Sequence, residues 1–169
     1  TPGADLVHHL FNLSRQKKLS FYFLGGSGEV ANKAAQIISK KYPNIDIKGA
    51  ENGGLIDIDN LINTKDIIAR INKTEPDILL VAFGHPKEEI FIDFWKENLK
   101  TKIAIGVGGS LDFIAKSQIR APKILRRIGF EWLWRLTLDP KRRWKRIVNA
   151  VYIFPKTYIQ TAFKNHLNK

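Results

Sequence analysis

The sequence has no cysteine and no methionine in its 169 residues. Without cysteine, the chain forms no disulfide, holds no metal through a thiolate and has no cysteine nucleophile. It also lacks any run of eighteen apolar residues, and its first residues lack the pattern of a signal peptide. We therefore predict a cytoplasmic protein. Because methionine is absent, we also expect the chain to be a piece of a longer protein.

Patterns typical of metal sites and of hydrolases are missing as well. The four histidines are His8, His9, His85 and His166, and none has further ligands at the spacing of a metal site. No serine, histidine and aspartate follow the arrangement of a nucleophilic triad. The sequence therefore predicts no metal, and we expect no other cofactor.

Positive charge is what the chain has in excess, and it is placed unevenly. The formal net charge is +12 at pH 7. Residues 1–119 hold fifteen basic and fourteen acidic side chains, whereas residues 120–169 hold thirteen basic and two acidic ones. A basic segment joined to a neutral domain favours a polyanion, a diphosphate or an anionic membrane surface as its partner. A basic face that is merely solvated is the alternative.

Short apolar runs alternate with helical patterns in residues 1–119. The expected strands are Leu19–Leu24, Ile45–Lys48, Ile78–Phe83 and Ile103–Val107, and the expected helices are Leu6–Gln16, Val30–Lys41, Lys65–Asn72 and Glu88–Leu99. This alternation predicts an α/β fold with a Rossmann-like, mostly parallel sheet flanked by helices. Ligands bind such sheets beyond the carboxyl ends of the strands.

The pattern changes after residue 119. Prolines at positions 122, 140 and 155 each stand where a helix is expected to begin. Apolar and aromatic residues recur along one side of each of these helices, and basic residues occupy the others. We therefore predict two parts, an α/β core over residues 1–119 and a basic helical appendage over residues 120–169.

Three glycine-rich loops follow expected strands. Gly25 and Gly26 lie between a strand and a helix, where backbone amides can approach a phosphate, although glycine also serves there simply to turn the chain. Gly108, Gly109 and Ser110 offer two amides and a hydroxyl to a diphosphate. Asp112 is expected to accept hydrogen bonds from a sugar or base, or else to cap a helix.

The remaining loop begins at Gly84 and carries one basic and one acidic candidate residue. Lys87 offers a cation to a phosphate, and Glu88 offers a carboxylate that can orient a hydroxyl group. The alternative is that the acidic residues here only complement the dipole of the helix they begin. All three loops are expected to open on the same edge of the sheet.

Taken together, these motifs resemble the bacterial teichoic-acid N-acetylmannosaminyltransferase family, over about residues 3–146. The matching stretches, in the order of that family, are Phe21–Gly26, Pro76–Val81 with Gly84–Glu89, Ile105–Phe113, Arg120–Lys123, and Glu131–Leu136 with Asp139–Arg142. The resemblance implies an inverting glycosyltransferase at the inner face of the membrane. Its donor would be a UDP-sugar and its acceptor N-acetylglucosamine on undecaprenyl diphosphate.

The resemblance also assigns residues. The donor site would comprise Gly25, Gly26, Gly84, Lys87, Gly108, Gly109, Ser110 and Asp112, with Glu88 contacting the donor sugar where the family usually has glutamine. Arg135 and Arg142 match family arginines that meet the acceptor diphosphate, and Lys145 stands where a third is common. The resemblance also implies a general base, an aspartate in an N-terminal segment of the family, and we expect it to lie outside this chain. The loop at residues 52–55 also lacks the aromatic residue that the family commonly has.

Other classes of function stay open. A nucleotide-binding or polyanion-binding module without catalysis would explain the basic appendage, but no nucleic-acid recognition motif is present. A nicotinamide or flavin oxidoreductase would explain the sheet. It would require the GxGxxG fingerprint and an acidic residue after the second strand, and we find neither in the expected elements. Self-association is left open.

Overall fold

The computed structural model describes residues 3–116, 122, 133–134 and 137. The chain divides into two compact units, Thr1–Ile119 and Arg120–Lys169. Of the expected helices beyond residue 119, positions 122, 133, 134 and 137 fall within the described residues. Residues 133, 134 and 137 are helical, whereas Pro122, where a helix was expected to begin, is not. The functions that we attached to residues 1–119 and 120–169 stay predictions.

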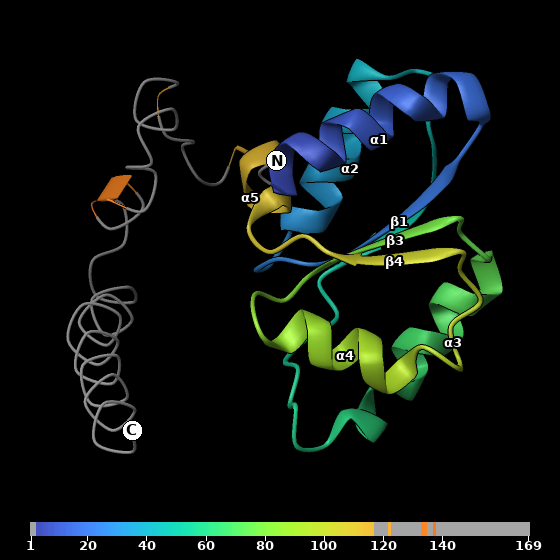
Figure 1. The fold of residues 1–169 in the computed structure, drawn as a ribbon, viewed down its shortest axis with the longest axis vertical. Helices are drawn as coiled ribbons and strands as arrows, with labels where there is room; N and C mark the ends of the chain where they lie inside the picture. Colours follow the sequence, from blue (N-terminus) through green and yellow to red (C-terminus); the bar gives the residue numbers. More distant parts are fainter. Residues whose placement is uncertain (1–2, 117–121, 123–132, 135–136, 138–169) are drawn as a thin grey trace, which may run out of the picture. The chain divides into compact units, whose positions relative to one another are not determined.

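The first unit alternates helices and strands along the chain (Figure 1). Its elements are α1 (Gly3–Lys17), β1 (Ser20–Gly25), α2 (Val30–Lys41), β2 (Asp46–Glu51), the 3₁₀ helix η1 (Leu61–Thr64), α3 (Lys65–Thr74), β3 (Ile78–Ala82), α4 (Lys87–Trp95), β4 (Ile103–Gly106) and α5 (Ser110–Ile114). None of the helices in the described part of the chain is long and apolar enough to cross a bilayer.

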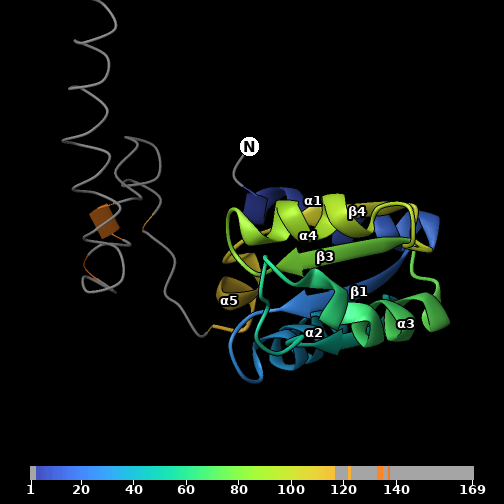
Figure 2. The same cartoon turned by 90° about the horizontal axis from the view of Figure 1, so that it is seen from below.

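The four strands form one parallel sheet in the order β2-β1-β3-β4. In Figure 2 the arrowheads of β1 and β3 point the same way, toward the side on which α5 lies. Helices α1, α2 and α5 cover one face of the sheet, and α3 and α4 cover the other (Figure 1). The predicted α/β fold with a parallel, Rossmann-like sheet is confirmed.

Alternate residues of the central strands supply two separate cores. Phe21 and Phe23 of β1 lie in the core beneath α1 and α2, whereas Tyr22 and Leu24 lie in the core beneath α3 and α4. Every residue of β1 and β3 is buried, which explains why these strands read as continuous apolar runs. The loops that follow them are therefore held on a rigid base.

One boundary and two short helices differ from the prediction. We expected the second strand to end at Lys48, but β2 continues through Gly49 to Glu51. The ring of Tyr22 occupies the space that a side chain at position 49 would need, so this glycine belongs inside the strand. Helices η1 and α5 were not predicted, because four or five residues are too few to show the regular spacing of apolar residues that marks a helix.

The amino edge of the sheet is held by one carboxylate. Asp77, just before β3, accepts hydrogen bonds from the amide and the hydroxyl of Ser20 at 2.8 Å each, and it pairs with Lys102 at 2.7 Å. The bond from Lys102, followed by those from Ser20, lowers the pKa of Asp77 to about 2. This carboxylate thereby joins the starts of β1, β3 and β4.

We expect Asp77→Asn to lower the free energy of unfolding by about 1 kcal/mol at pH 7, because hydrogen bonds and an ion pair to a charged group are weakened. The pKa of Asp77 is lowered in the folded protein, so its contribution is present above the unfolded value of about 3.9 and is lost as the pH falls toward 2. Urea denaturation at pH 7, 4 and 2.5 should show the difference from the unmodified chain shrinking.

Asp46→Asn is the matched control for this experiment. Asp46 pairs with Lys48 at 2.9 Å on an exposed part of β2, where an ion pair contributes little. Its removal should change the free energy of unfolding by less than about 0.5 kcal/mol. Equal effects of the two substitutions would show that Asp77 does not brace the sheet.

Candidate functional site

The predicted loops meet where the direction of strand addition reverses. From β1 the chain moves outward to β2, and it then returns to place β3 on the other side of β1. The loop after β1 lies directly against the end of β3, because the Gly26 amide donates to the carbonyl of Ala82 at 2.9 Å. A Cβ atom on Gly25 would lie 2.6 Å from the Ala82 backbone, and the φ angle of Gly25 is 112°. Only glycine fits there, at the position where parallel sheets bind ligands.

Glu88 links the loops that follow β3 and β4. It lies in the first turn of α4 and is only 5% exposed. One carboxylate oxygen accepts the Gly84 amide at 2.9 Å, and the Gly108 amide donates to the same carboxylate at 3.0 Å. A single side chain therefore fixes the distance between two of the three predicted loops.

Burial and hydrogen bonding act in opposite directions on this carboxyl group. Burial raises the pKa of Glu88, and the amides of Gly84 and Gly108 oppose that rise without cancelling it. The neighbouring Glu89 is exposed and lies 3.0 Å from Nδ1 of His85, a contact that lowers the pKa of Glu89. Thus the pKa of Glu88 is raised and that of Glu89 is lowered, although the two residues are adjacent.

In the loop after β4, fewer backbone amides are available to bind a diphosphate than the sequence predicted. The Gly108 amide donates to Glu88, and the Ser110 amide donates to the carbonyl of Val107 at 3.0 Å. Ser110 is buried, and Asp112 lies in the first turn of α5. The cradle stays a prediction, but one of its two glycine amides, that of Gly108, already has an acceptor within the protein.

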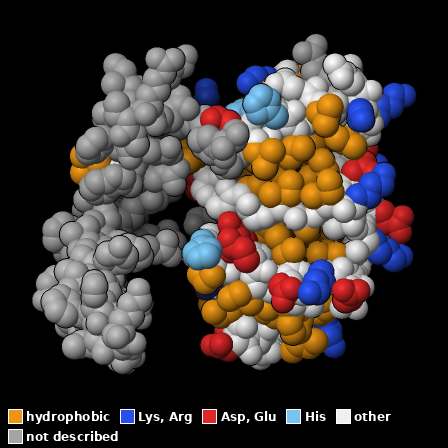
Figure 3. All heavy atoms as spheres, in the orientation of Figure 1, with side chains coloured by type: hydrophobic (Ala, Val, Ile, Leu, Met, Phe, Trp, Pro, Cys, Tyr) orange, Lys and Arg blue, Asp and Glu red, His pale blue; other side chains and the backbone are white. Residues whose placement is uncertain are grey.

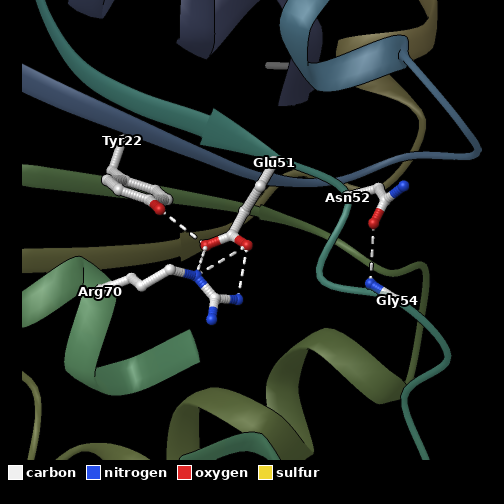
Figure 4. Close-up of polar contacts among 5 residues, drawn as sticks. All are labelled: Tyr22, Glu51, Asn52, Gly54 and Arg70. Atoms are coloured by element: carbon white, nitrogen blue, oxygen red, sulfur yellow. Dashed lines mark hydrogen bonds and ion pairs between the residues drawn. The ribbon is translucent and has the colours of Figure 1, made fainter. Parts of the chain in front are cut away.

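Lys87 and Asn52 join the loop after β2 to the others. The ammonium group of Lys87 donates to the carbonyl of Ile56 at 2.9 Å, and the amide group of Asn52 donates to the carbonyl of Gly28 at 3.1 Å. Asn52 also accepts the amide of Gly54 at 2.8 Å (Figure 4). Our sequence reasoning noted only that this loop lacks an aromatic residue. The Asn-Gly-Gly pattern, which is typical of a turn that an asparagine side chain supports, was the signal we did not use.

Glu51 corrects one statement of the sequence analysis. Because β2 extends to Glu51, an acidic residue does stand at the end of the second strand. Its carboxylate accepts 2.7 Å hydrogen bonds from the Tyr22 hydroxyl and from the Arg70 guanidinium, as Figure 4 shows. Burial works to raise the pKa of Glu51, but the bonds from Arg70 and Tyr22 outweigh it and lower the pKa. The carboxylate is thus ionised and already bound from within the protein.

The rest of the predicted site is not described. Arg135, Arg142 and Lys145 lie outside the described residues. Within the described part of the chain, no three histidine, aspartate or glutamate side chains gather where they could hold a metal ion.

Comparison with known proteins decides the family. The model of the glycosyl transferase WecG/TagA/CpsF family matches residues 1–167. The chain belongs to this family. A Bacillus subtilis (strain 168) relative is 33% identical over 168 residues, which cover 99% of this chain and 60% of the relative. A Staphylococcus aureus (strain MRSA252) relative is 32% identical over 146 residues, which cover 86% of this chain and 54% of the relative.

Both relatives carry the name N-acetylglucosaminyldiphosphoundecaprenol N-acetyl-beta-D-mannosaminyltransferase. The resemblance predicted from the sequence motifs is therefore confirmed at the level of the family. The chain spans between 54% and 60% of the length of these two relatives.

The two adjacent glutamates allow a test by pH. A raised pKa means that Glu88 stabilises the fold below the unfolded pKa of about 4.3 and that this contribution is lost as the pH rises. Glu88→Gln should therefore gain stability relative to the unmodified chain between about pH 4 and pH 7. The free energy of unfolding from urea titrations at several pH values measures this change.

Glu89→Gln is the control and should behave in the opposite way. The pKa of Glu89 is lowered, so its contribution is lost as the pH falls below the unfolded pKa of about 4.3 and is fully present above it. The variant should therefore lose relative stability as the pH rises toward about 4.3, and it should show no gain between about pH 4 and pH 7. If both variants shifted in the same direction, the buried position of Glu88 would not be controlling its protonation.

Proposed function

We propose that this chain contains the donor-binding part of a glycosyltransferase. The donor is a UDP-sugar that carries N-acetylmannosamine or a related sugar, and the acceptor is N-acetylglucosamine linked to undecaprenyl diphosphate. The transfer inverts the anomeric carbon and serves the synthesis of cell-wall or surface polysaccharide. The protein works in the cytoplasm, attached peripherally to the inner face of the membrane.

One observation carries the proposal. The loops after β1, β3 and β4 meet at the reversal point of a parallel sheet, and they are held there by the Gly26 bond to Ala82 and by Glu88. This is the position at which such sheets bind nucleotides. The names of the Bacillus subtilis and Staphylococcus aureus relatives supply the acceptor and the transferred sugar.

Inverting transfer needs a base for the acceptor hydroxyl and a group that stabilises the leaving diphosphate. In our proposal this chain supplies the second requirement through the glycine loops, while the base comes from polypeptide outside it. Glu88 then acts by setting the spacing of the loops. Arg135, Arg142 and Lys145 bind the acceptor diphosphate, for which guanidinium groups have the suitable planar geometry.

The alternative is a nucleotide-binding or polyanion-binding module without catalysis. The basic residues between positions 120 and 169 favour it, since they would bind any polyanion. An oxidoreductase is less well supported, because the acidic residue at the end of β2 that would bind a ribose is already held by Arg70 and Tyr22.

Calorimetry with UDP and with NAD separates these functions. We expect UDP to bind with a dissociation constant of roughly 1 µM to 1 mM, and NAD to bind at least tenfold more weakly.

Asp112→Asn should weaken UDP binding by about tenfold through loss of a charged hydrogen-bond acceptor. Asp93→Asn is the control, because Asp93 is exposed on α4 and pairs with Lys96. Salt-dependent binding of RNA with no response to UDP would contradict the proposal.

Arg135→Ala tests the appendage. Loss of one guanidinium from an anion site should reduce the affinity for a polyprenyl diphosphate acceptor by about tenfold or more and leave UDP affinity unchanged. Affinity is measured with a water-soluble diphosphate-linked N-acetylglucosamine, and turnover by release of UDP. An unchanged affinity for this acceptor would remove Arg135 from the site.

A further inference from the structure

The four loops at the carboxyl edge of the sheet have almost no source of positive charge. They comprise residues 26–29, 52–60, 83–86 and 107–109, and they contain no lysine and no arginine. His85 is the one residue in these loops that can become a cation. In Figure 3 a histidine (pale blue) lies beside acidic side chains (red) where α4 begins, and lysine and arginine side chains (blue) gather toward the opposite edge of the sheet.

Other donors at this edge are already engaged within the protein. The ammonium group of Lys87, in the first turn of α4, donates to a loop carbonyl at 2.9 Å. The amides of Gly26 and Gly108 donate to internal acceptors at 2.9 Å and 3.0 Å. A leaving diphosphate needs donors or positive charge placed where its own charge develops. Among the loop side chains, His85 is the one that can supply that charge.

Glu89 determines which ring nitrogen of His85 acts on a ligand. Its carboxylate lies 3.0 Å from Nδ1. The hydrogen bond from His85 lowers the pKa of Glu89, so this carboxylate is ionised at neutral pH and can only accept hydrogen bonds. Nδ1 must then carry a proton, and Nε2 becomes the nitrogen that acts on a ligand. The His85 side chain is 78% exposed, so a ligand can reach the ring.

Only the doubly protonated ring can donate to a phosphate oxygen in this arrangement. In a neutral imidazole one nitrogen donates and the other accepts. With the proton on Nδ1, a neutral ring would place a lone pair of Nε2 against the phosphate oxygen, whereas the imidazolium places an N–H there. Binding of a phosphate through Nε2 therefore takes up a proton whenever the ring is neutral before the ligand arrives.

The other charged groups at this edge are mostly acidic. The charge of His85 acts to lower the pKa of Glu88, against the rise that burial causes. The loops also hold Glu29, Asp57 and Asp59, and the first turns of α2, α4 and α5 hold Lys33, Lys87, Glu89 and Asp112. Because acidic side chains outnumber basic ones, an anion that binds here needs a further cation.

We propose that His85, held by Glu89, binds a phosphate oxygen of the donor diphosphate through Nε2 as an imidazolium. This role of His85 rests on the proposed function, since it adds a residue to the donor site for the UDP-sugar. The proton taken up on binding offsets part of the negative charge that develops on the leaving diphosphate. Donor affinity therefore falls as the pH rises.

Calorimetry with UDP-N-acetylmannosamine between about pH 5.5 and pH 8 tests this role, because histidine side chains change charge in that interval. A UDP-sugar is the probe, since it lacks the terminal phosphate of UDP, which itself titrates at about pH 6. The unmodified chain should bind the donor about tenfold more tightly at the acidic end of the interval than at the basic end. Heats measured in two buffers of different ionisation enthalpy should show proton uptake on binding.

His85→Gln should remove the pH dependence and the proton uptake, and it should weaken donor binding about tenfold at the acidic end. His9→Gln is the matched control and should change neither, because His9 is exposed on α1. Glu89→Gln should reduce the proton uptake, since the amide oxygen still accepts from Nδ1 but no longer opposes the charge of the ring. An unfolding transition in urea shows that each variant is folded.

Unchanged pH dependence in His85→Gln would overturn the role of His85 and leave the proposed function in place. A dependence that only Glu88→Gln removes would overturn it too, by assigning the proton to Glu88. The same holds if His9→Gln abolishes the dependence. Failure of the unmodified chain to bind the donor at any pH would contradict the proposed function itself, and the role of His85 with it.

Discussion

The pairing of β1 with β3 is the contact on which both cores and the site depend. These strands are neighbours in the sheet although β2 comes between them in the sequence. Their side chains alternate between the core under α1 and α2 and the core under α3 and α4. Because the two strands are parallel and in register from Phe21 with Ile78 to Gly25 with Ala82, their following loops must emerge side by side. The site is a direct consequence of this register.

Polar contacts then fix what the register brings together. At the amino edge, Asp77 joins the starts of three strands, and at the carboxyl edge Glu88 joins the loops after two of them. Tyr22, Glu51 and Arg70 form a third group at the end of β2. Each group contains one carboxylate that is satisfied by donors from separate elements. Such contacts order the loops before any ligand arrives, which reduces the entropy lost on binding.

Much of the fold could be predicted from the sequence, because its central strands are apolar on both faces and its longer helices are amphipathic. The range of α2 was predicted in full, and the other long elements were found within a few residues. The end of β2 was missed, since Gly49 looks like a strand terminator unless the position of the Tyr22 ring is known. Helices η1 and α5 were also missed, because they are too short to show a regular spacing of apolar residues.

The grouping of the three loops was predictable, but the contacts between them were less so. Glycines after strands marked loops that lie at one edge of the sheet, because the loops after parallel strands share it. That Glu88 turns inward to bind Gly84 and Gly108 depends on burial and on the spacing of β3 and β4, neither of which a single sequence displays. The same holds for Glu51, whose partners lie 29 and 19 residues away along the chain.

The side-chain contacts between the loops share one property, since each runs to the main chain. Asn52 binds the carbonyl of Gly28, Lys87 that of Ile56, and Glu88 the amides of Gly84 and Gly108. A main-chain partner is present whatever side chain its residue carries. Loop residues outside the positive-φ glycines Gly28, Gly84 and Gly108 can therefore change without removing these contacts. A frame of this kind tolerates substitutions elsewhere in the loops, provided that Asn52, Lys87 and Glu88 stay in place.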